Sequence, residues 1–214
     1  VGDPQQLNPV ILLSQIDNRK LRKTYKITDE YDYINNSIYK VFLACDSVSR
    51  EILLSHHYRC NDRIIQFNNK KYYNGKLKIC NHSKELHPLV FIDVPENKTY
   101  CKNTATMEVN QIIKYASMNK DKSIGVITPF ANQKELINQE LKDNELSNVS
   151  CGTVHAFQGD EKDVVLFSTA LSDRTNAGTY QWLKNNKELI NVATSRAKDK
   201  LVLLADSKEL ERLH

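Results

Sequence analysis

The chain has 214 residues, of which 40% are hydrophobic and 26% charged, and its 30 Lys and Arg against 26 Asp and Glu give a net charge of +4. This composition excludes a wholly disordered or collagenous chain, and the absence of any apolar run of about 18 residues excludes a transmembrane helix. The mild positive charge permits a phosphate polyanion as a partner without requiring one.

The chain begins at Val1 rather than at a methionine, and no basic and then apolar leader opens it. We therefore expect a piece of a longer polypeptide. The five cysteines are scattered and form no C-x-x-C pair, which predicts a reduced, cytoplasmic protein with free thiols. They are Cys45, Cys60, Cys80, Cys101 and Cys151.

The first quarter of the chain predicts little regular structure. Residues 1–9 predict the end of a strand that runs into a Gly-Asp-Pro turn. The charged residues 18–32 predict an exposed connection or insertion. Apolar side chains at helical spacing in residues 37–45 predict a short amphipathic helix, and residues 52–54 predict a strand.

The rest of the chain predicts a regular alternation of strands and helices. Asn61 is the expected N-cap of a helix that ends near Gly75. After it, Val, Ile and Leu runs alternate with helical stretches, which predicts an α/β fold with a parallel sheet flanked by helices on both faces. The expected strands are 89–93, 124–128, 149–153, 164–169 and 201–205, and the expected helices are 107–117, 133–141 and 188–196.

Residues 173–187 interrupt this pattern and predict a surface loop. Trp182 within it either stacks on a base or packs the loop onto the core. Packing is the commoner use of such a residue, so we expect packing.

Ligands of open parallel sheets bind beyond the carboxyl ends of the strands, which points to segments 128–130 and 153–161 and to the segment before Glu188. In the second segment, Gly159 lets a phosphate or ribose approach the backbone, and Glu161 can accept hydrogen bonds from sugar hydroxyls. Arg59 follows an expected strand and is therefore expected to face the same crevice, where a guanidinium suits phosphate geometry. Taken alone, each feature also has an ordinary interpretation as a polar loop or a surface charge.

A group of residues with the chemistry of zinc ligands lies between positions 56 and 82. Its members are His56, His57, Cys60, Cys80 and His82. Their spacing fits no standard zinc finger, so we predict ordinary helix-start and loop residues and no metal site.

The order and spacing of five segments resemble one protein family, the superfamily 1 helicases. Residues 1–7, Tyr58-Arg59, 125–130, 153–163 and 191–198 resemble its motif III, motif IV, an intervening Thr-Pro element, motif V and motif VI. The similarity is greatest to the branch that contains the nonsense-mediated-decay helicase and its DNA-helicase relatives, which move 5′ to 3′.

The resemblance extends from residue 1 to about residue 206 and implies a domain organisation. Residues 1–9 would be the end of a first RecA-like domain, 10–50 a linker or insertion with a short helix, and 51–214 a second RecA-like domain. In this family ATP binds between the two domains of the same polypeptide and nucleic acid lies across both.

The resemblance also implies roles for individual residues. Gln6 would sense the γ-phosphate of ATP, and Arg59 and Arg196 would reach it as arginine fingers, because phosphoryl transfer develops negative charge that a guanidinium stabilises. The residues implied to line the nucleotide are Tyr58, Gln158, Gly159 and Glu161. The residues implied to face the backbone of a single-stranded nucleic acid, DNA in preference to RNA, are Thr128, Pro129, Thr153 and His155.

The chain departs from the family pattern in one respect, since it contains no G-x-x-x-x-G-K-[ST] loop and no Asp-Glu pair after a strand. In the family those parts, including the Mg²⁺ ligands, belong to the first domain, upstream of Val1. We therefore expect this chain alone neither to hydrolyse ATP nor to unwind nucleic acid. Two alternatives stay open: a non-catalytic nucleotide- or nucleic-acid-binding module, and an ATP-driven remodeller that does not unwind.

Overall fold

The computed structural model describes residues 2–7, 11–46, 48, 52–81, 83–96, 99 and 101–213. Val1 and His82, which were named above, lie outside the described residues. The chain divides into two compact units, residues 1–54 and 55–214, and each is described by itself. The predicted boundaries at residues 9 and 50 stay a prediction.

The first unit contains two α-helices and one turn of 3₁₀ helix. They are α1 (Gln15–Tyr25), η1 (Asp29–Tyr31) and α2 (Ile38–Cys45). The α2 prediction is confirmed, and the Ser37 hydroxyl caps it by accepting a hydrogen bond from the Lys40 backbone amide, 3.4 Å away.

Helix α1 replaces the exposed connection that the charge run predicted. The Asp32 side chain is buried and accepts hydrogen bonds from Asn18 Nδ2, at 2.8 Å, and Arg22 Nη1, at 3.0 Å. The hydrogen bond from Asn18 is the main cause that lowers the pKa of Asp32. Polar side chains of α1 therefore donate hydrogen bonds to the buried Asp32 carboxylate. These hydrogen bonds, and not burial of apolar side chains, hold the helix in place, since its one buried residue is Asn18.

The second unit is built on a five-stranded parallel sheet with the order β3-β7-β6-β4-β5. Its strands are β3 (Leu89–Asp93), β4 (Ile124–Thr128), β5 (Val149–Thr153), β6 (Lys162–Ser168) and β7 (Ala197–Ala205). The helices of this unit are α3 (Asp62–Tyr72), α4 (Thr106–Met118), α5 (Ala131–Asp143), α6 (Ala177–Asn185), α7 (Lys187–Thr194) and α8 (Ser207–Leu213).

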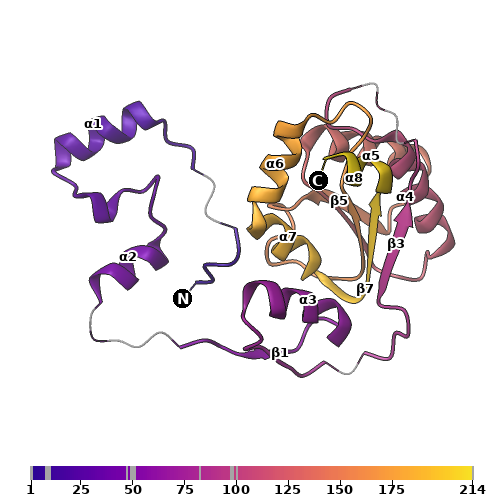
Figure 1. Ribbon diagram of the computed structural model, residues 1–214, viewed down its shortest axis with the longest axis horizontal. Coiled ribbons are helices and arrows are strands. Elements are labelled where there is room, and N and C mark those ends of the chain that lie inside the picture. Colours follow the sequence, from indigo (N-terminus) through magenta and orange to yellow (C-terminus); the bar gives the residue numbers. More distant parts are fainter. Residues whose placement is uncertain are drawn as a thin grey trace. The chain divides into compact units, whose positions relative to one another are not determined.

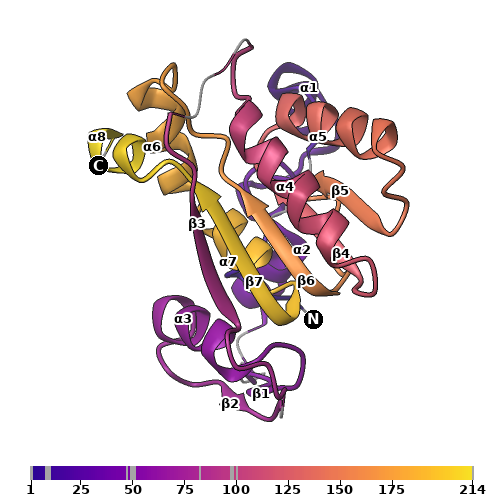
Figure 2. The same ribbon diagram turned by 90° about the vertical axis from the view of Figure 1, so that its right-hand side faces the viewer.

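Helices cover both faces of this sheet, as predicted. The crossovers through α4 and α5 run toward β5, whereas the crossover through α6 and α7 runs back from β6 to β7. Because such crossovers are right-handed, opposite directions place the two pairs of helices on opposite faces. Figure 1 shows α6 and α7 on one side of the strands and α4 and α5 on the other, and Figure 2 views the sheet from the α4 and α5 side.

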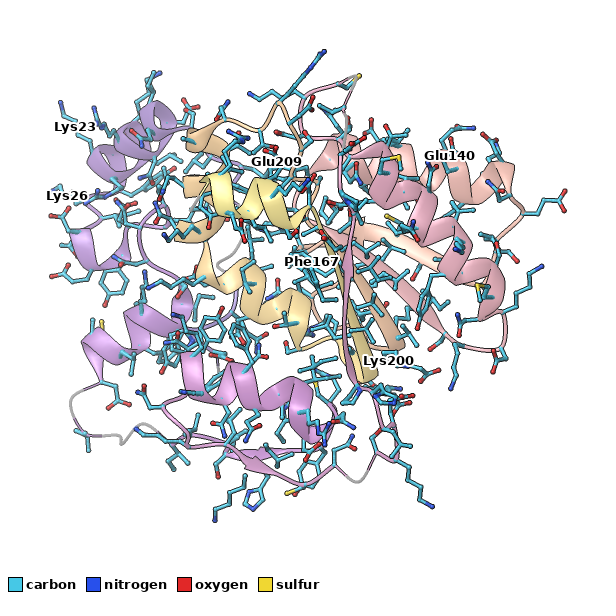
Figure 3. All side chains as sticks on the ribbon, turned by 45° about the vertical axis from the view of Figure 1, so that its right-hand side comes forward. Lys23, Lys26, Glu140, Phe167, Lys200 and Glu209 are labelled. Atoms are coloured by element: carbon cyan, nitrogen blue, oxygen red, sulfur yellow. The ribbon has the colours of Figure 1, made fainter. Side chains whose placement is uncertain are left out.

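The core lies between the sheet and α4 and α5. Its fully buried members include Ile112 on α4, Ile137 on α5 and Val126, Leu166 and Leu204 on the three central strands. Figure 3 shows Phe167 within the sheet, where it is 4% exposed, and Lys200 toward the end at which the strands begin, where its Nζ pairs with Glu85 Oε1 at 3.2 Å. The unbroken apolar runs of the sequence are therefore the buried strands.

Four further secondary-structure predictions were wrong. Residues 52–54 form no strand; a two-residue strand, β1 (His56–His57), lies just beyond them and pairs in parallel with β2 (Lys78–Ile79). The expected loop at 173–187 contains α6, capped by the Asn176 side chain, which accepts a hydrogen bond from the Thr179 amide at 2.8 Å. The helix expected to end at Arg196 ends at Thr194, and β7 begins four residues earlier than predicted.

No helix in the described ranges is both long and apolar enough to cross a membrane.

Candidate nucleotide and nucleic-acid surfaces

The five parallel strands define two edges of the sheet, here called the amino edge, where the strands begin, and the carboxyl edge, where they end. Motif IV lies at the amino edge. The Asn61 amide donates to the Lys198 carbonyl at 2.6 Å, and the Cys60 thiol donates to the Ser195 carbonyl at 3.3 Å. These bonds attach the turn between β1 and α3, which carries Tyr58 and Arg59, to the first residues of β7.

Glu161 is held between two cations at this amino edge. Arg59 Nε lies 2.8 Å from Glu161 Oε2, and Lys198 Nζ lies 3.0 Å from Glu161 Oε1. The hydrogen bond from Arg59, followed by that from Lys198, lowers the pKa of Glu161. Glu161 precedes the first residue of β6 and Lys198 is the second residue of β7. The expectation that Arg59 faces the carboxyl-end crevice was therefore wrong. Arg59 pairs with a residue at the start of β6 and thus lies at the amino edge, opposite that crevice.

Arg196 lies in the same neighbourhood but is buried. Its side chain is 2% exposed, its Nε donates to the Val192 carbonyl at 3.2 Å, and its Nη2 donates to Ser195 Oγ at 3.3 Å. Burial lowers its pKa, and the positive charge of Arg59 lowers it further. The charges of the two guanidinium groups therefore interact, but Arg196 is buried, so Arg59 is the one of the two that is accessible to an anion such as a phosphate.

An open pocket of about 450 Å³ exposes this cluster. It is lined by His56, His57, Tyr58, Arg59 and Glu161. The Tyr58 side chain is 69% exposed, and its ring stacks on that of His56 with 6.3 Å between centroids and 17° between planes. One pocket thus offers an aromatic face, a guanidinium and a carboxylate, which match the base, phosphate and ribose of a nucleotide.

His57 organises the wall of this pocket. Its Nε2 accepts a hydrogen bond from the Cys60 amide at 3.0 Å, which requires that nitrogen to be unprotonated. Burial, followed by the charges of Arg59 and Arg196, lowers its pKa to about 4. Burial also raises the pKa of the Cys60 thiol to about 12. Both residues are neutral at physiological pH and serve to fix the turn that carries Arg59.

We expect the free energy of unfolding to fall as the pH drops from about 6.5 toward 4. Over this window the unfolded chain, in which a histidine has a pKa near 6.5, takes up a proton that His57 in the fold does not. Protonation therefore favours the unfolded state. Urea unfolding of the wild type and of His57→Gln at pH 7 and pH 4.5 measures the effect, because glutamine can accept the Cys60 hydrogen bond without titrating.

The His57→Gln variant should lose less stability between the two pH values than the wild type does. The exposed His87, replaced by glutamine, is the matched control and should leave the loss unchanged. An equal loss in His57→Gln and wild type would contradict this account of the motif IV turn.

The residues expected to face nucleic acid lie at the carboxyl edge, where Thr128 of β4 and Thr153 of β5 are register partners. Thr128 is fully buried, and its Oγ1 accepts a hydrogen bond from the Phe130 amide at 3.5 Å. Pro129 and Thr153 are half-buried and His155 is exposed. Three of the four predicted contact residues are therefore accessible, whereas Thr128 supports the turn into α5.

The motif V segment, residues 153–161, joins the two edges without a helix. It leaves β5 at the carboxyl edge and reaches β6 at the amino edge. The Phe157 ring, 4% exposed, lies against two glycines on neighbouring strands: a Cβ on Gly125 would come within 2.9 Å of the ring, and one on Gly152 within 3.0 Å. These glycines allow the aromatic ring to lie directly on the sheet.

Two further motif V residues, Gln158 and Gly159, are exposed on this segment. Gly159 has φ of +95°, which favours glycine, and a Cβ there would meet nothing within 4 Å. The backbone at Gly159 is thus open to a ligand near Glu161.

Gln6 belongs to the first unit. Its Nε2 donates to Asp3 Oδ2 at 2.8 Å, and Asp3 Oδ1 accepts a hydrogen bond from the Gln5 amide at 2.9 Å. The Gly-Asp-Pro turn is therefore internally hydrogen-bonded, as the sequence predicted, whereas the described residues 2–7 contain no strand end.

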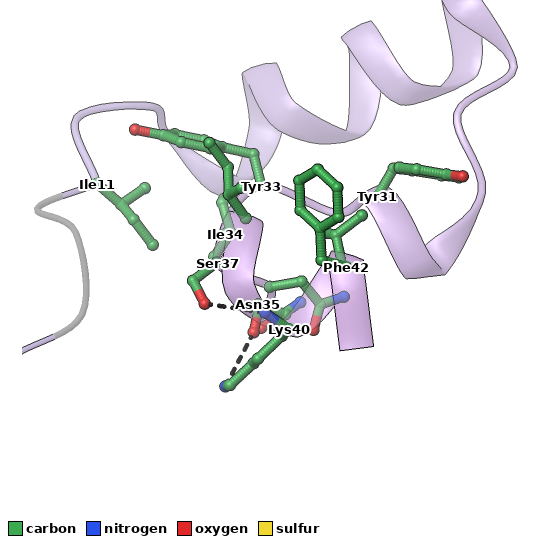
Figure 4. A pocket seen from close by; sticks show the side chains of 11 residues that line it. Ile11, Tyr31, Tyr33, Ile34, Asn35, Ser37, Lys40 and Phe42 are labelled. Atoms are coloured by element: carbon green, nitrogen blue, oxygen red, sulfur yellow. Dashed lines mark hydrogen bonds between the residues drawn. The ribbon is translucent and has the colours of Figure 1, made fainter. Parts of the chain in front are cut away.

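Sequence reasoning gave no role to Lys198, although it lay inside motif VI, nor to the pocket of the first unit. That pocket encloses about 660 Å³ and is apolar on most sides (Figure 4). Its aromatic and aliphatic walls come from Ile11, Tyr31, Tyr33, Ile34, Ile38 and Phe42.

The zinc-ligand residue types are mostly engaged elsewhere: His57 and Cys60 in the hydrogen bonds given above, and Cys80 with the Lys78 carbonyl at 3.5 Å. Within the part of the chain that the structure describes, no three His, Cys, Asp or Glu side chains gather as metal ligands do.

Comparison with known proteins identifies the family. A family model described as an AAA domain matches residues 34–208. The chain belongs to this family, among the superfamily 1 helicases. This helicase domain is 27% identical over 244 residues to RNA helicase Mov10l1 of Mus musculus, with 99% of this chain and 20% of that protein covered.

The helicase domain is also 28% identical over 258 residues to DNA polymerase alpha-associated DNA helicase A of Saccharomyces cerevisiae, with 99% of this chain and 36% of that protein covered. The chain thus spans between a fifth and just over a third of these relatives' lengths. Among solved structures, it is similar to the C-terminal domain of a possible DNA helicase from Lactobacillus, with a TM-score of 0.48, 19% identity, and 73% of this chain and 94% of that chain covered.

Proposed function

We propose that the chain is the C-terminal motor domain of an ATP-dependent nucleic-acid helicase or translocase, with ATP at its amino edge and single-stranded nucleic acid at its carboxyl edge. The observation that carries the proposal is the placement of Glu161 between Arg59 and Lys198 in a pocket lined by Tyr58. Three residues that the resemblance links to the nucleotide, Tyr58, Arg59 and Glu161, line this pocket.

The chemistry of the pocket fits a nucleoside triphosphate. Glu161 can accept hydrogen bonds from ribose hydroxyls, the Tyr58 ring can stack on the base, and Arg59 can stabilise the charge on the transferred phosphoryl group. Arg196 is buried here and would have to become exposed to serve as the second arginine finger. ATP would supply the energy of its hydrolysis to move the two domains of the motor. We assign no Mg²⁺ ligand to this chain. By the family pattern, Gln6 would sense the γ-phosphate.

Glu161 can bind ribose hydroxyls only if it gives up a hydrogen bond to one of its two cationic partners. Glu161 is bound to Arg59 and Lys198 here, so we propose that ribose replaces one of them when a nucleotide binds. Since both ion pairs are partly exposed, with side-chain exposures of 30–42%, opening them costs little.

The direct test is the binding of a fluorescent ATP analogue measured by anisotropy. We expect Arg59→Ala to weaken binding about 10- to 100-fold, the value of a charged hydrogen bond, and Glu161→Gln to weaken it less. Glu140→Gln on α5 is the matched control. Equal binding by Arg59→Ala and wild type would contradict the proposed nucleotide site.

We also expect the chain alone neither to hydrolyse ATP nor to unwind a duplex, because its sequence contains no P-loop for the proposed arginine fingers, Arg59 and Arg196, to act with. A phosphate-release assay with the pure 214-residue chain measures this. ATP turnover above background that Arg196→Ala abolishes would overturn the prediction.

We further propose single-stranded DNA in preference to RNA as the partner, and a cytoplasmic location. The first rests on the resemblance, and competition between dT and rU oligonucleotides of equal length tests it; tighter binding of the RNA would contradict it. The second is supported by the five cysteines, all of which are free thiols.

A further inference from the structure

Trp182 lies at the carboxyl edge, in the segment before Glu188 that was expected to lie beyond the carboxyl ends of the strands. Helix α6 follows the carboxyl end of β6, and its Trp182 ring contacts Phe130 with 5.8 Å between centroids and 38° between planes. Phe130 comes directly after Pro129, one of the residues proposed to face nucleic acid. Two segments about fifty positions apart in the sequence therefore meet beside the proposed nucleic-acid contacts.

The two rings differ in how far they are exposed. Phe130 is 8% exposed and Trp182 is 45% exposed. Packing alone, as expected from the sequence, accounts for the ring contact but leaves nearly half of the indole surface in solvent. The neighbouring Leu183 is 6% exposed and anchors α6, and the Trp182 carbonyl accepts hydrogen bonds from Asn186 Nδ2 at 2.6 Å and the Asn186 amide at 3.1 Å. The ring is thus presented from a fixed backbone.

The charge around the ring suits a polyanion. Helix α6 contains no acidic residue, and its one charged side chain, Lys184, has its Nζ 6.0 Å from the Tyr180 ring centroid. On the Phe130 side, Lys134 lies one helical turn along α5, where its backbone amide donates to the Phe130 carbonyl. The helices that carry the aromatic pair each contribute a lysine, of which Lys134 also has a carboxylate neighbour, since its Nζ lies 3.9 Å from Glu135 Oε1. A ligand that combines phosphates with flat aromatic groups complements such a surface.

We propose that Trp182, backed by Phe130, is a base-stacking site for a single-stranded nucleic acid that runs along the carboxyl edge. The inference rests on the proposed function, because it takes the carboxyl edge as the nucleic-acid surface. Stacking tolerates any base, so the site adds affinity without sequence preference.

The chain offers a specific probe for this site, because Trp182 is its only tryptophan. Tryptophan fluorescence is recorded while the full chain is titrated with a dT 15-mer and with an abasic 15-mer that has the same phosphates but no bases. We expect dT to quench the emission and the abasic strand to leave it nearly unchanged. Binding itself is followed by the anisotropy of a fluorescein label on each strand.

The variants separate stacking from phosphate contact. Trp182→Leu should weaken dT binding about 5- to 100-fold, the range for one stacked base, and leave abasic binding unchanged. Trp182→Phe keeps a ring against Phe130 and should retain part of the affinity, and circular dichroism checks that both variants fold.

Each outcome of this experiment is decisive. Equal affinity of the wild type for dT and abasic strands, or an unchanged dT affinity in Trp182→Leu, would overturn the stacking site. Neither result would contradict phosphate binding at the carboxyl edge. Binding of neither strand would overturn the proposed nucleic-acid edge, and the stacking site with it.

Discussion

Phe157→Ala should lower the free energy of unfolding by about 3–5 kcal/mol, the usual cost of removing a buried aromatic side chain. The Phe157 ring is 4% exposed and fills the space above Gly125 and Gly152 on two neighbouring strands. Its loss would leave a cavity on the sheet and detach the motif V segment from the surface that it crosses. Urea denaturation followed by far-ultraviolet circular dichroism measures the change.

Two further variants show whether the ring and the glycines act as one unit. Gly152→Ala places a Cβ 3.0 Å from the ring and should cost about 1–3 kcal/mol through overpacking. Phe67→Ala removes a ring that is 48% exposed on α3 and should cost clearly less than Phe157→Ala. A Phe157→Ala variant within 1 kcal/mol of wild type would show that the segment is held in another way.

Glu108→Leu should lower the free energy of unfolding by about 2–4 kcal/mol, because it leaves buried donors without their acceptor. The Glu108 carboxylate, fully buried on α4, accepts hydrogen bonds from Ser168 Oγ at 2.6 Å, Thr169 Oγ1 at 3.2 Å and the Ala170 amide at 3.0 Å. Gln133 Nε2 also donates to Ser168 Oγ, at 2.9 Å. This network fixes the chain where it leaves β6 toward α6.

Glu135→Leu is the matched control for Glu108→Leu. The Glu135 side chain on α5 is 73% exposed and lies 3.9 Å from Lys134 Nζ in a surface ion pair, so the change should stay within about 0.5 kcal/mol. Equal stability of Glu108→Leu and Glu135→Leu would contradict a structural role for the buried carboxylate.

The strands at 89–93, 124–128 and 149–153 were predicted to the residue. The apolar run of 124–128 is buried throughout, as expected for a central strand of a parallel sheet, whereas 89–93 and 149–153 are edge strands and are only partly buried. Helices α1 and α6 were not predictable in this way. The first is held by polar contacts to one buried carboxylate, Asp32, and the second begins at an Asn176 cap inside a stretch rich in turn-forming residues. Both helices therefore depend on specific polar contacts, and a regular spacing of apolar residues does not predict them.

The sequence named residues of the candidate site but did not predict where they lie on the sheet or which of them contact each other. Motif resemblance named Arg59 and Glu161, and the structure joins them by an ion pair between residues about a hundred positions apart. The edge on which they meet depends on the path of residues 153–161, which cross the sheet without a helix. The burial of Arg196 and the ion pair between Lys198 and Glu161 also depend on tertiary contacts. No local sequence pattern predicts them.

The central claim is that nucleotide and nucleic acid bind at opposite edges of one sheet, joined by the motif V segment. Backbone amide shifts in a ¹H–¹⁵N NMR spectrum of the chain test it, recorded with ATP and then with a dT 15-mer. ATP should shift residues 57–61 and 159–161, and the oligonucleotide should shift 129–131, 153–155 and the α6 residues around Trp182. Shifts from both ligands confined to the same edge, or exchanged between the edges, would contradict the account.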